Sequence, residues 1–122
     1  MDIRKLQKVA VAALEDIKAR DIEVINTRKL SALFDRIIIA TGDSNRQVKS
    51  LARSVHDKVK EAGGQVIGIE GEEAGEWVLV DLGDIVVHVM QPVVRAYYNL
   101  EELWKVAPKR ARKKADSDAE GA

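Results

Sequence analysis

Residues 77–90 constrain the fold of this chain most strongly, because they form two apolar runs separated by a short break. The break contains Gly83, and glycine suits a tight hairpin loop since it reaches positive φ without a Cβ clash. Both flanking runs are rich in valine and isoleucine, which favour a pleated, buried surface. The stretch therefore predicts a β-hairpin. It also carries four side chains that a purely structural hairpin does not need: Trp77, Asp81, Asp84 and His88.

The rest of the chain alternates helical and strand patterns in the order α-β-β-α-β-β-β-α. The ranges are 2–20 (helix), 22–26 and 33–40 (strands), 44–62 (helix), 65–70 (strand), 77–90 (the two strands of the hairpin) and 93–98 (helix), followed by a last short turn or helix at 99–104. Asp2 is the expected cap of the first helix, and Ser44 or Asp43 that of the second. This order predicts an α/β fold, with a mixed sheet of about five strands and helices packed mainly on one face. A right-handed crossover is expected between the strands at Ile37 and Val66.

The length of 122 residues is enough for a single core, so we expect one domain over residues 1–107. Residues 108–122 are charged and have no large apolar side chain, so we expect a disordered tail. The chain has no cysteine, which excludes disulfides and thiolate chemistry. It has no apolar run near the roughly 20 residues that span a bilayer and no signal-peptide core at its start. We therefore expect a cytoplasmic protein with no membrane contact.

The formal net charge is zero, but the charges are unevenly distributed. Residues 61–94 contain no lysine or arginine. The acids in that sector are Glu61, Glu70, Glu72, Glu73, Glu76, Asp81 and Asp84. Such a surface repels a phosphate backbone and attracts a basic protein. A merely solvated acidic loop is the alternative interpretation.

A catalytic interpretation starts from the turn at residues 41–44, between a buried strand and a helix, where backbone amides can bind an anion. The turn lacks the P-loop and dinucleotide-binding signatures, and a strand-to-helix turn needs a glycine and a cap in any case. Together with Asp81 and Asp84 it is faintly similar to metal-dependent nucleotidyltransferases, whose metal-binding acids lie two residues apart on one strand face. Here the acids are three apart across a turn. We therefore expect no enzyme, metal or cofactor, and keep the metal-dependent nucleotidyltransferase as the alternative.

Histidine and the aromatic residues leave two questions open. His88 lies within an apolar strand, where a lone histidine is more often structural than catalytic, although it could also orient the turn between Asp81 and Asp84. Aromatic side chains beside acids at the edge of a sheet are typical of an interface anchor, and core packing is the alternative. We expect Trp77 and one of Tyr97 and Tyr98 to be exposed.

Several motifs occur together in a fixed order. They are Arg46-Gln47-Val48 after the turn, Gly75-Glu76-Trp77 at the start of the hairpin, Asp81 to Asp84 at its break, Val87-His88 within it, and Arg95 with Tyr98 to Trp104 after it. In this combination the chain resembles the ribosomal silencing factor family (RsfS, also called Iojap) over about residues 2–105. Two positions depart mildly from the family pattern: Asn45, where many members carry histidine, and Met90, where many carry an aromatic residue.

The resemblance implies a nucleotidyltransferase-like fold without transferase activity. It implies a translational repressor that binds the large ribosomal subunit through ribosomal protein L-fourteen, sterically blocks joining of the small subunit, and lowers translation when nutrients run short. Such a factor needs only an interface of ordinary size. The expected partner-binding residues are Trp77 and Tyr98 as anchors, Glu76, Asp81, Asp84 and Glu101 as polar partners, and Val87 and Met90 as an apolar extension.

Two further partners are expected at the margins of this site. Peripheral contact with ribosomal RNA is favoured by the bases Arg46, Lys49 and Arg53 and by those of the tail. An RNA-binding module is the third hypothesis for the main function, and it ranks last because the basic helix has no aromatic residues between its bases. An apolar strand edge near Trp77 favours a homodimer when the protein is free. The free oligomeric state, the release mechanism and the role of the tail stay open.

Overall fold

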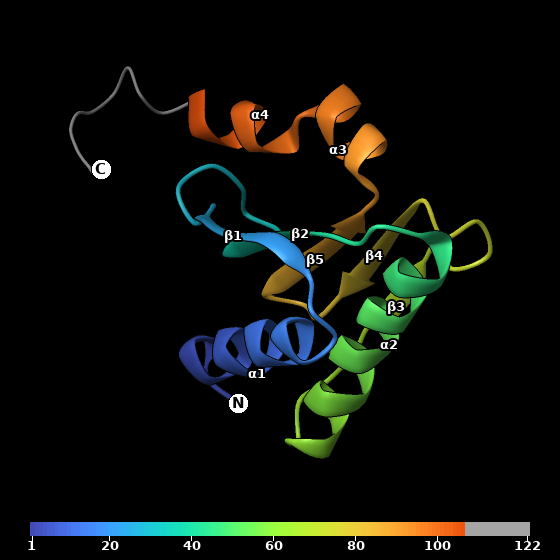
Figure 1. Cartoon of the computed structure of the whole chain (residues 1–122). Coiled ribbons are helices and arrows are strands. Elements are labelled where there is room, and N and C mark those ends of the chain that lie inside the picture. Colours follow the sequence, from blue (N-terminus) through green and yellow to red (C-terminus); the bar gives the residue numbers. More distant parts are fainter. Residues whose placement is uncertain (107–122) are drawn as a thin grey trace.

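The computed structural model describes residues 1–106 (Figure 1). Its elements are α1 (Ile3–Asp16), β1 (Arg20–Asn26), β2 (Arg36–Thr41), α2 (Asn45–Glu61), β3 (Gly68–Glu70), β4 (Trp77–Asp81), β5 (Ile85–Met90), α3 (Pro92–Tyr98) and α4 (Leu100–Val106). The predicted order of helices and strands is confirmed. The expected tail at residues 108–122 lies outside the described residues, and so does the domain boundary. Within the described part of the chain, no helix is long and apolar enough to cross a membrane.

The five strands form one mixed sheet in the order β1-β2-β5-β4-β3, which confirms the predicted sheet. Only β2 and β5 pair in parallel, and the other neighbours are antiparallel. The predicted hairpin is present as β4 and β5, with Trp77 opposite Met90 and Gly83 at a φ of 91° in the break. The crossover from β2 through α2 leads to β3, yet β5 and β4 lie between those two strands. The two strands expected around this crossover are therefore not neighbours.

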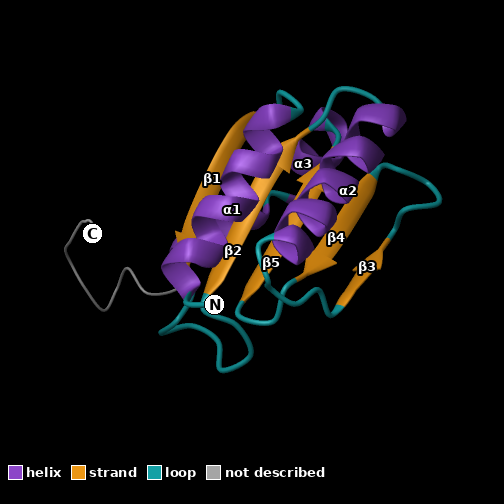
Figure 2. Cartoon of the chain, turned by 90° about the horizontal axis from the view of Figure 1, so that it is seen from below, coloured by secondary structure: helices purple, strands orange, loops and turns teal. Residues whose placement is uncertain are grey.

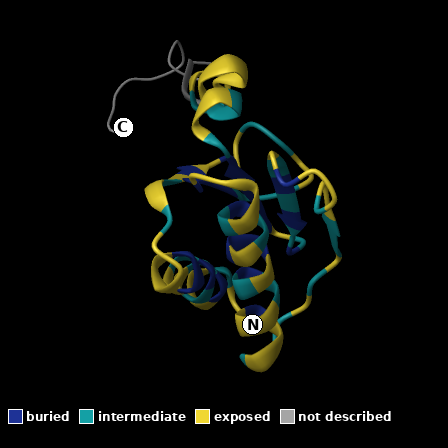
Figure 3. Cartoon of the chain, turned by 45° about the vertical axis from the view of Figure 1, so that its right-hand side comes forward, coloured by how far each residue is buried: buried dark blue, intermediate teal, exposed yellow. Residues whose placement is uncertain are grey.

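Helices lie on both sides of the sheet, but the two long ones share one side (Figures 1 and 2). Under α1 and α2, β5 contributes Val87 and Val89 to the main core, where they meet Leu14, Leu51 and Val55. The short helices α3 and α4 lie over the opposite face above a smaller core. That core consists of Ile25, Ile37, Ile39 and Met90, with Phe34, Trp77, Val94, Leu100 and Trp104 packed against it. Figure 3 shows the same division, with buried strands between helices whose outer surfaces are exposed.

The helix ends show which local predictions hold. Asp2 caps α1, since its side chain accepts a hydrogen bond from the Lys5 amide at 2.9 Å, and Ser44 caps α2 in the same way from the Gln47 amide at 3.1 Å. One side of α2 is buried, and it consists of Val48, Leu51, Ala52, Val55 and Val59. However, α1 ends at Asp16 rather than near residue 20, because Lys18 adopts a left-handed φ of 61° and the chain turns into β1.

Candidate docking surface

The short helices leave part of the second sheet face uncovered, on the side of β3 and β4. Successive side chains of a strand point to opposite faces of the sheet. This uncovered part is therefore formed by the residues that alternate with those buried under α1 and α2. We define it as the open sheet face, which comprises Glu70, Trp77, Leu79, Asp81 and His88. Leu79 is half-buried and belongs to neither core cluster. A partner could therefore reach apolar, aromatic and acidic groups on one side of the sheet.

Trp77 forms the boundary between the smaller core and the open sheet face. Its indole Nε1 donates a hydrogen bond to His88 Nδ1 at 3.0 Å, and its ring centroid lies 4.8 Å from that of Tyr98. The indole also packs against the smaller core. Trp77 is consequently half-buried rather than exposed as expected, because these contacts cover part of its ring.

The tyrosines differ from the expectation as well, since both are exposed. Tyr97 is 80% exposed and Tyr98 is 54% exposed, with their ring centroids 5.0 Å apart in an edge-to-face arrangement. Helix α3 is short, and it packs inward through Val94 and Arg95 rather than through either tyrosine. His88, Trp77, Tyr98 and Tyr97 therefore form a continuous series of ring contacts, which we call the aromatic stack.

The two aspartates of the hairpin have separate roles. Asp81 is half-buried, and its Oδ1 accepts a hydrogen bond from the Gly83 amide at 2.9 Å, so this carboxylate builds the turn. The backbone carbonyl of Asp84 accepts from the amides of Asp35 and Arg36, while Asp84 itself is exposed. Glu76 is exposed beside Trp77. Among the described residues, no group of three or more histidines and acids could hold a metal ion.

Three of the predicted partner-binding residues are committed to the fold itself. Val87 is fully buried under α1 and α2, and Met90 is fully buried in the smaller core, because β5 is the central strand of the sheet. Neither presents a surface to a partner, so we correct both assignments. Glu101 accepts a 2.7 Å hydrogen bond from Arg95 Nε, and only 16% of its side chain is accessible. Glu101 therefore acts first as an internal ion-pair partner.

Arg95 holds the helix that carries the tyrosines, a role that sequence reasoning did not assign to it. Its Nη1 donates to Thr41 Oγ1 at 2.8 Å and to the Asp21 carbonyl at 2.7 Å, and its Nη2 lies 3.9 Å from Glu23 Oε1. Only 12% of the side chain is accessible. An arginine inside a short helix of otherwise uncharged residues was the only local signal. This contact joins α3 to β1 and β2.

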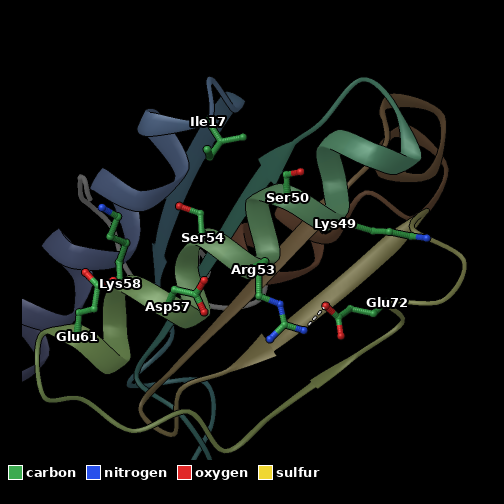
Figure 4. A pocket seen from close by; sticks show the side chains of 9 residues that line it. All are labelled: Ile17, Lys49, Ser50, Arg53, Ser54, Asp57, Lys58, Glu61 and Glu72. Atoms are coloured by element: carbon green, nitrogen blue, oxygen red, sulfur yellow. Dashed lines mark hydrogen bonds and ion pairs between the residues drawn. The ribbon is translucent and has the colours of Figure 1, made fainter.

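A hollow lies along α2 (Figure 4). It is lined by Ile17, Lys49, Ser50, Arg53, Ser54, Asp57, Lys58, Glu61 and Glu72. Arg53 pairs with Glu72 at 2.6 Å, and the Ser54 hydroxyl donates to the Ala13 carbonyl. Acids and bases are mixed along this wall, and Lys49 does not point toward Arg53 in Figure 4. The hollow offers no convergent set of groups for catalysis or for one type of ligand.

Comparison with known proteins gives matches over most of the chain. Residues 1–122 match the protein family described as "Ribosomal silencing factor during starvation". The chain is 62% identical over 104 residues to a Chromobacterium violaceum protein named "Ribosomal silencing factor RsfS", and the match covers 85% of each chain. A crystal structure of a protein from Chromobacterium violaceum superimposes with a TM-score of 0.84 at 56% identity, covering 94% of this chain and 92% of the other.

A more distant similarity extends to an animal protein. The mouse protein named "Mitochondrial assembly of ribosomal large subunit protein 1" is 33% identical over 97 residues, which is 77% of this chain and 42% of that protein.

Proposed function

The chain belongs to the ribosomal silencing factor family, and we propose that it binds the large ribosomal subunit through ribosomal protein L-fourteen and thereby blocks joining of the small subunit. Family membership supports a ribosome-associated role in silencing translation. The identity of the partner protein and the steric block are proposed in addition to this role. By blocking subunit joining, the protein would lower translation in the cytoplasm under nutrient limitation.

The observation that carries the proposal is the aromatic stack beside exposed acids that belong to residues 61–94, a stretch of sequence without lysine or arginine. Tyr98 offers a large, half-exposed ring, Glu76 and Glu70 are exposed just before β4 and at the end of β3, and Asp84 is exposed in the turn between β4 and β5. An aromatic anchor with a charged rim is typical of a protein interface, and an acidic rim favours a basic partner. A surface of about 800 Å² on each partner is enough for stable binding.

The same residues give little support to the nucleotidyltransferase alternative. Asp81 uses a carboxylate oxygen to hold the Gly83 amide, whereas Asp84 lies beyond the turn at the start of the next strand. The two carboxylates therefore do not form the paired arrangement on one strand face that holds a divalent metal. We propose that the protein acts by occupying a surface and needs no catalytic turnover.

Co-sedimentation with purified ribosomal subunits tests this proposal. We expect the wild-type protein to sediment with isolated large subunits and to reduce their joining to small subunits. Asp84→Lys should weaken this binding several-fold, more so at low salt, because it places a like charge against a basic partner. Glu15→Lys makes the same charge change on α1, on the other side of the sheet, and should bind like the wild type.

Two results would contradict the proposal. One is a wild-type protein that does not sediment with large subunits, and the other is a protein that binds them without hindering subunit joining. A wild-type affinity for Asp84→Lys together with a weakened Glu15→Lys would place the interface on the helical side instead.

We also propose two secondary contacts. Arg46 is exposed at the start of α2 and could touch ribosomal RNA at the edge of a protein-centred site. The exposed rings of Tyr97 and Tyr98 favour pairing of two copies when no ribosome is present. The mass of the free protein in solution, measured for the wild type and for Tyr97→Ala with Tyr98→Ala, tests the second contact.

A further inference from the structure

The hydrogen bond between Trp77 and His88 fixes the protonation of the imidazole. An indole N–H can only donate, so His88 Nδ1, 3.0 Å from Trp77 Nε1, must accept with a lone pair. The ring proton of a neutral His88 must then lie on Nε2. A protonated ring would carry a hydrogen on Nδ1, facing the indole hydrogen, and the bond would be lost. The geometry therefore admits one form of His88, the neutral Nε2–H tautomer.

The surroundings of His88 favour the same form. The side chain is 9% exposed, and its neighbours across the sheet are Leu79 on β4 and Ile39 on β2. Burial lowers the pKa of His88 to about 4, so the ring is neutral at neutral pH. Among the described residues, no other group is hydrogen-bonded to the imidazole of His88.

The bond matters because of what rests on the indole. Trp77 is the first residue of β4, and the ring of Tyr98, the last residue of α3, packs against the indole at a tilt of 49° with the ring centroids 4.8 Å apart. The ring centroids of Trp77 and His88 are 5.9 Å apart. The indole thus lies between a fixed acceptor in the sheet and a half-exposed ring on a short helix. A change in its orientation would move the surface that Tyr98 presents.

We propose that His88 is a positioning residue of the docking surface, whose neutral Nε2–H tautomer holds the Trp77 indole in the orientation on which Tyr98 stacks. The effect on ribosome binding rests on the function proposed above, whereas the tautomer and the held indole are properties of the free protein. His88 thereby acts through Trp77 and Tyr98.

Two substitutions separate this role from simple core filling. His88→Asn can place an amide oxygen close to the position of Nδ1, and so keeps an acceptor for the indole. His88→Leu keeps a buried side chain of similar size but has no acceptor. A core-filling role predicts that leucine is tolerated at least as well as asparagine, while a positioning role predicts that only asparagine restores the indole contact.

Hydrogen exchange of the Trp77 indole proton in the full-length free protein gives the first measurement, with the resonance assigned by its absence in Trp77→Phe. We expect slow exchange in the wild type, similar exchange in His88→Asn, and exchange at least about tenfold faster in His88→Leu. The ¹⁵N shifts of the wild-type imidazole should show a protonated Nε2 and an unprotonated Nδ1. An indole exchange rate in His88→Leu equal to that of the wild type would overturn the proposal. A proton on Nδ1 of His88 would also overturn it, and that measurement is made on the wild type, so it does not depend on whether a variant folds.

Affinity for isolated large subunits gives the second measurement. We expect His88→Leu and Trp77→Phe each to weaken binding about tenfold, and the double variant to be no weaker than either one, because both remove the same contact. Additive losses, or a wild-type affinity in His88→Leu, would contradict the positioning role. If the wild type itself fails to bind, the function proposed above is wrong, and the indole and imidazole measurements still decide the role of His88.

Discussion

Strand β5 presents Val87 and Val89 to α1 and α2, whereas its other face presents His88 and Met90 to the region that α3 and α4 only partly cover. The first face is uniformly apolar and sealed by two long helices. The second combines a sealed part around Met90 with the open sheet face, where an imidazole, an indole and a carboxylate replace valine. The docking surface proposed above therefore lies on the opposite side of these strands from the main core. A substitution should therefore affect folding or binding according to the side on which it lies.

The sharpest test of this division is one carboxylate placed on either face. Val87→Asp buries a charge in the main core with no partner, so we expect a loss of roughly 4 kcal/mol or more in the free energy of unfolding. Leu79→Asp on the open sheet face should cost only about 1 kcal/mol, because Leu79 is half-buried. Urea denaturation of both variants measures the contrast. Equal losses in the free energy of unfolding would show that the two faces contribute equally to stability.

Arg95 tests how the exposed tyrosines are held against the sheet. Arg95→Ala removes a mostly buried ion pair with Glu101 at 2.7 Å, together with the hydrogen bonds from Arg95 to Thr41 and the Asp21 carbonyl, so we expect a loss of about 3 kcal/mol in the free energy of unfolding. The matched control is Arg28→Ala, since Arg28 pairs with Asp35 at 3.5 Å on the surface and should contribute less than about 1 kcal/mol. A loss in Arg95→Ala no larger than in the control would mean that α3 is held by apolar packing alone.

The pH dependence of stability tests the neutral histidine beneath the open sheet face. The pKa of His88 falls from 6.5 to about 4 on folding, so the unfolded chain binds its proton more readily. The stability that this group contributes is complete above pH 6.5, falls as the pH is lowered, and is lost by about pH 4. The difference of about 2.5 units corresponds to about 3 kcal/mol. Urea unfolding at pH 7 and pH 4.5 should show most of this loss in the wild type and lack it in His88→Asn, and identical profiles of the two proteins would contradict the expectation.

The smallest effect on folding is expected at Asp84. Asp84 is exposed, and its backbone carbonyl rather than its carboxylate contacts β2. Asp84→Asn should therefore change the free energy of unfolding by less than about 0.5 kcal/mol. It should nonetheless weaken the salt dependence of binding to large subunits, since one charge is removed from the rim. An affinity that has the same salt dependence as the wild type would remove Asp84 from the interface.

The parts of the fold that could be predicted are those set by local chemistry. Ser44 followed by apolar residues at helical spacing, and Gly63 after the last of them, give α2 within one residue at each end. The break at Gly83 gives the hairpin for the same reason. By contrast, β3 was expected to begin at residue 65 but begins at Gly68, because its partner β4 ends at Asp81 opposite that residue. The extent of a strand depends on a neighbour that local patterns do not reveal.

The candidate site was less predictable for a related reason. Residue type and charge singled out Trp77 and Asp84, of which the structure places Trp77 against the smaller core and leaves Asp84 exposed in the turn between β4 and β5. Val87 and Met90 were misassigned because the burial of both faces of β5 depends on helices from both ends of the chain. The contact from Arg95 to Glu101 depends on the turn between α3 and α4, where Asn99 takes a left-handed φ of 48°. These features follow from tertiary structure rather than from spacing.

The equilibrium affinity of Tyr98→Ala for isolated large ribosomal subunits tests most directly whether the open sheet face and its aromatic stack are the docking surface. Tyr98 is half-exposed and outside both cores, so its truncation should leave the urea midpoint almost unchanged. If Tyr98 is a central anchor, its loss should weaken binding about 30-fold, equivalent to about 2 kcal/mol. A Tyr98→Ala protein that folds normally and binds large subunits with wild-type affinity would contradict the account.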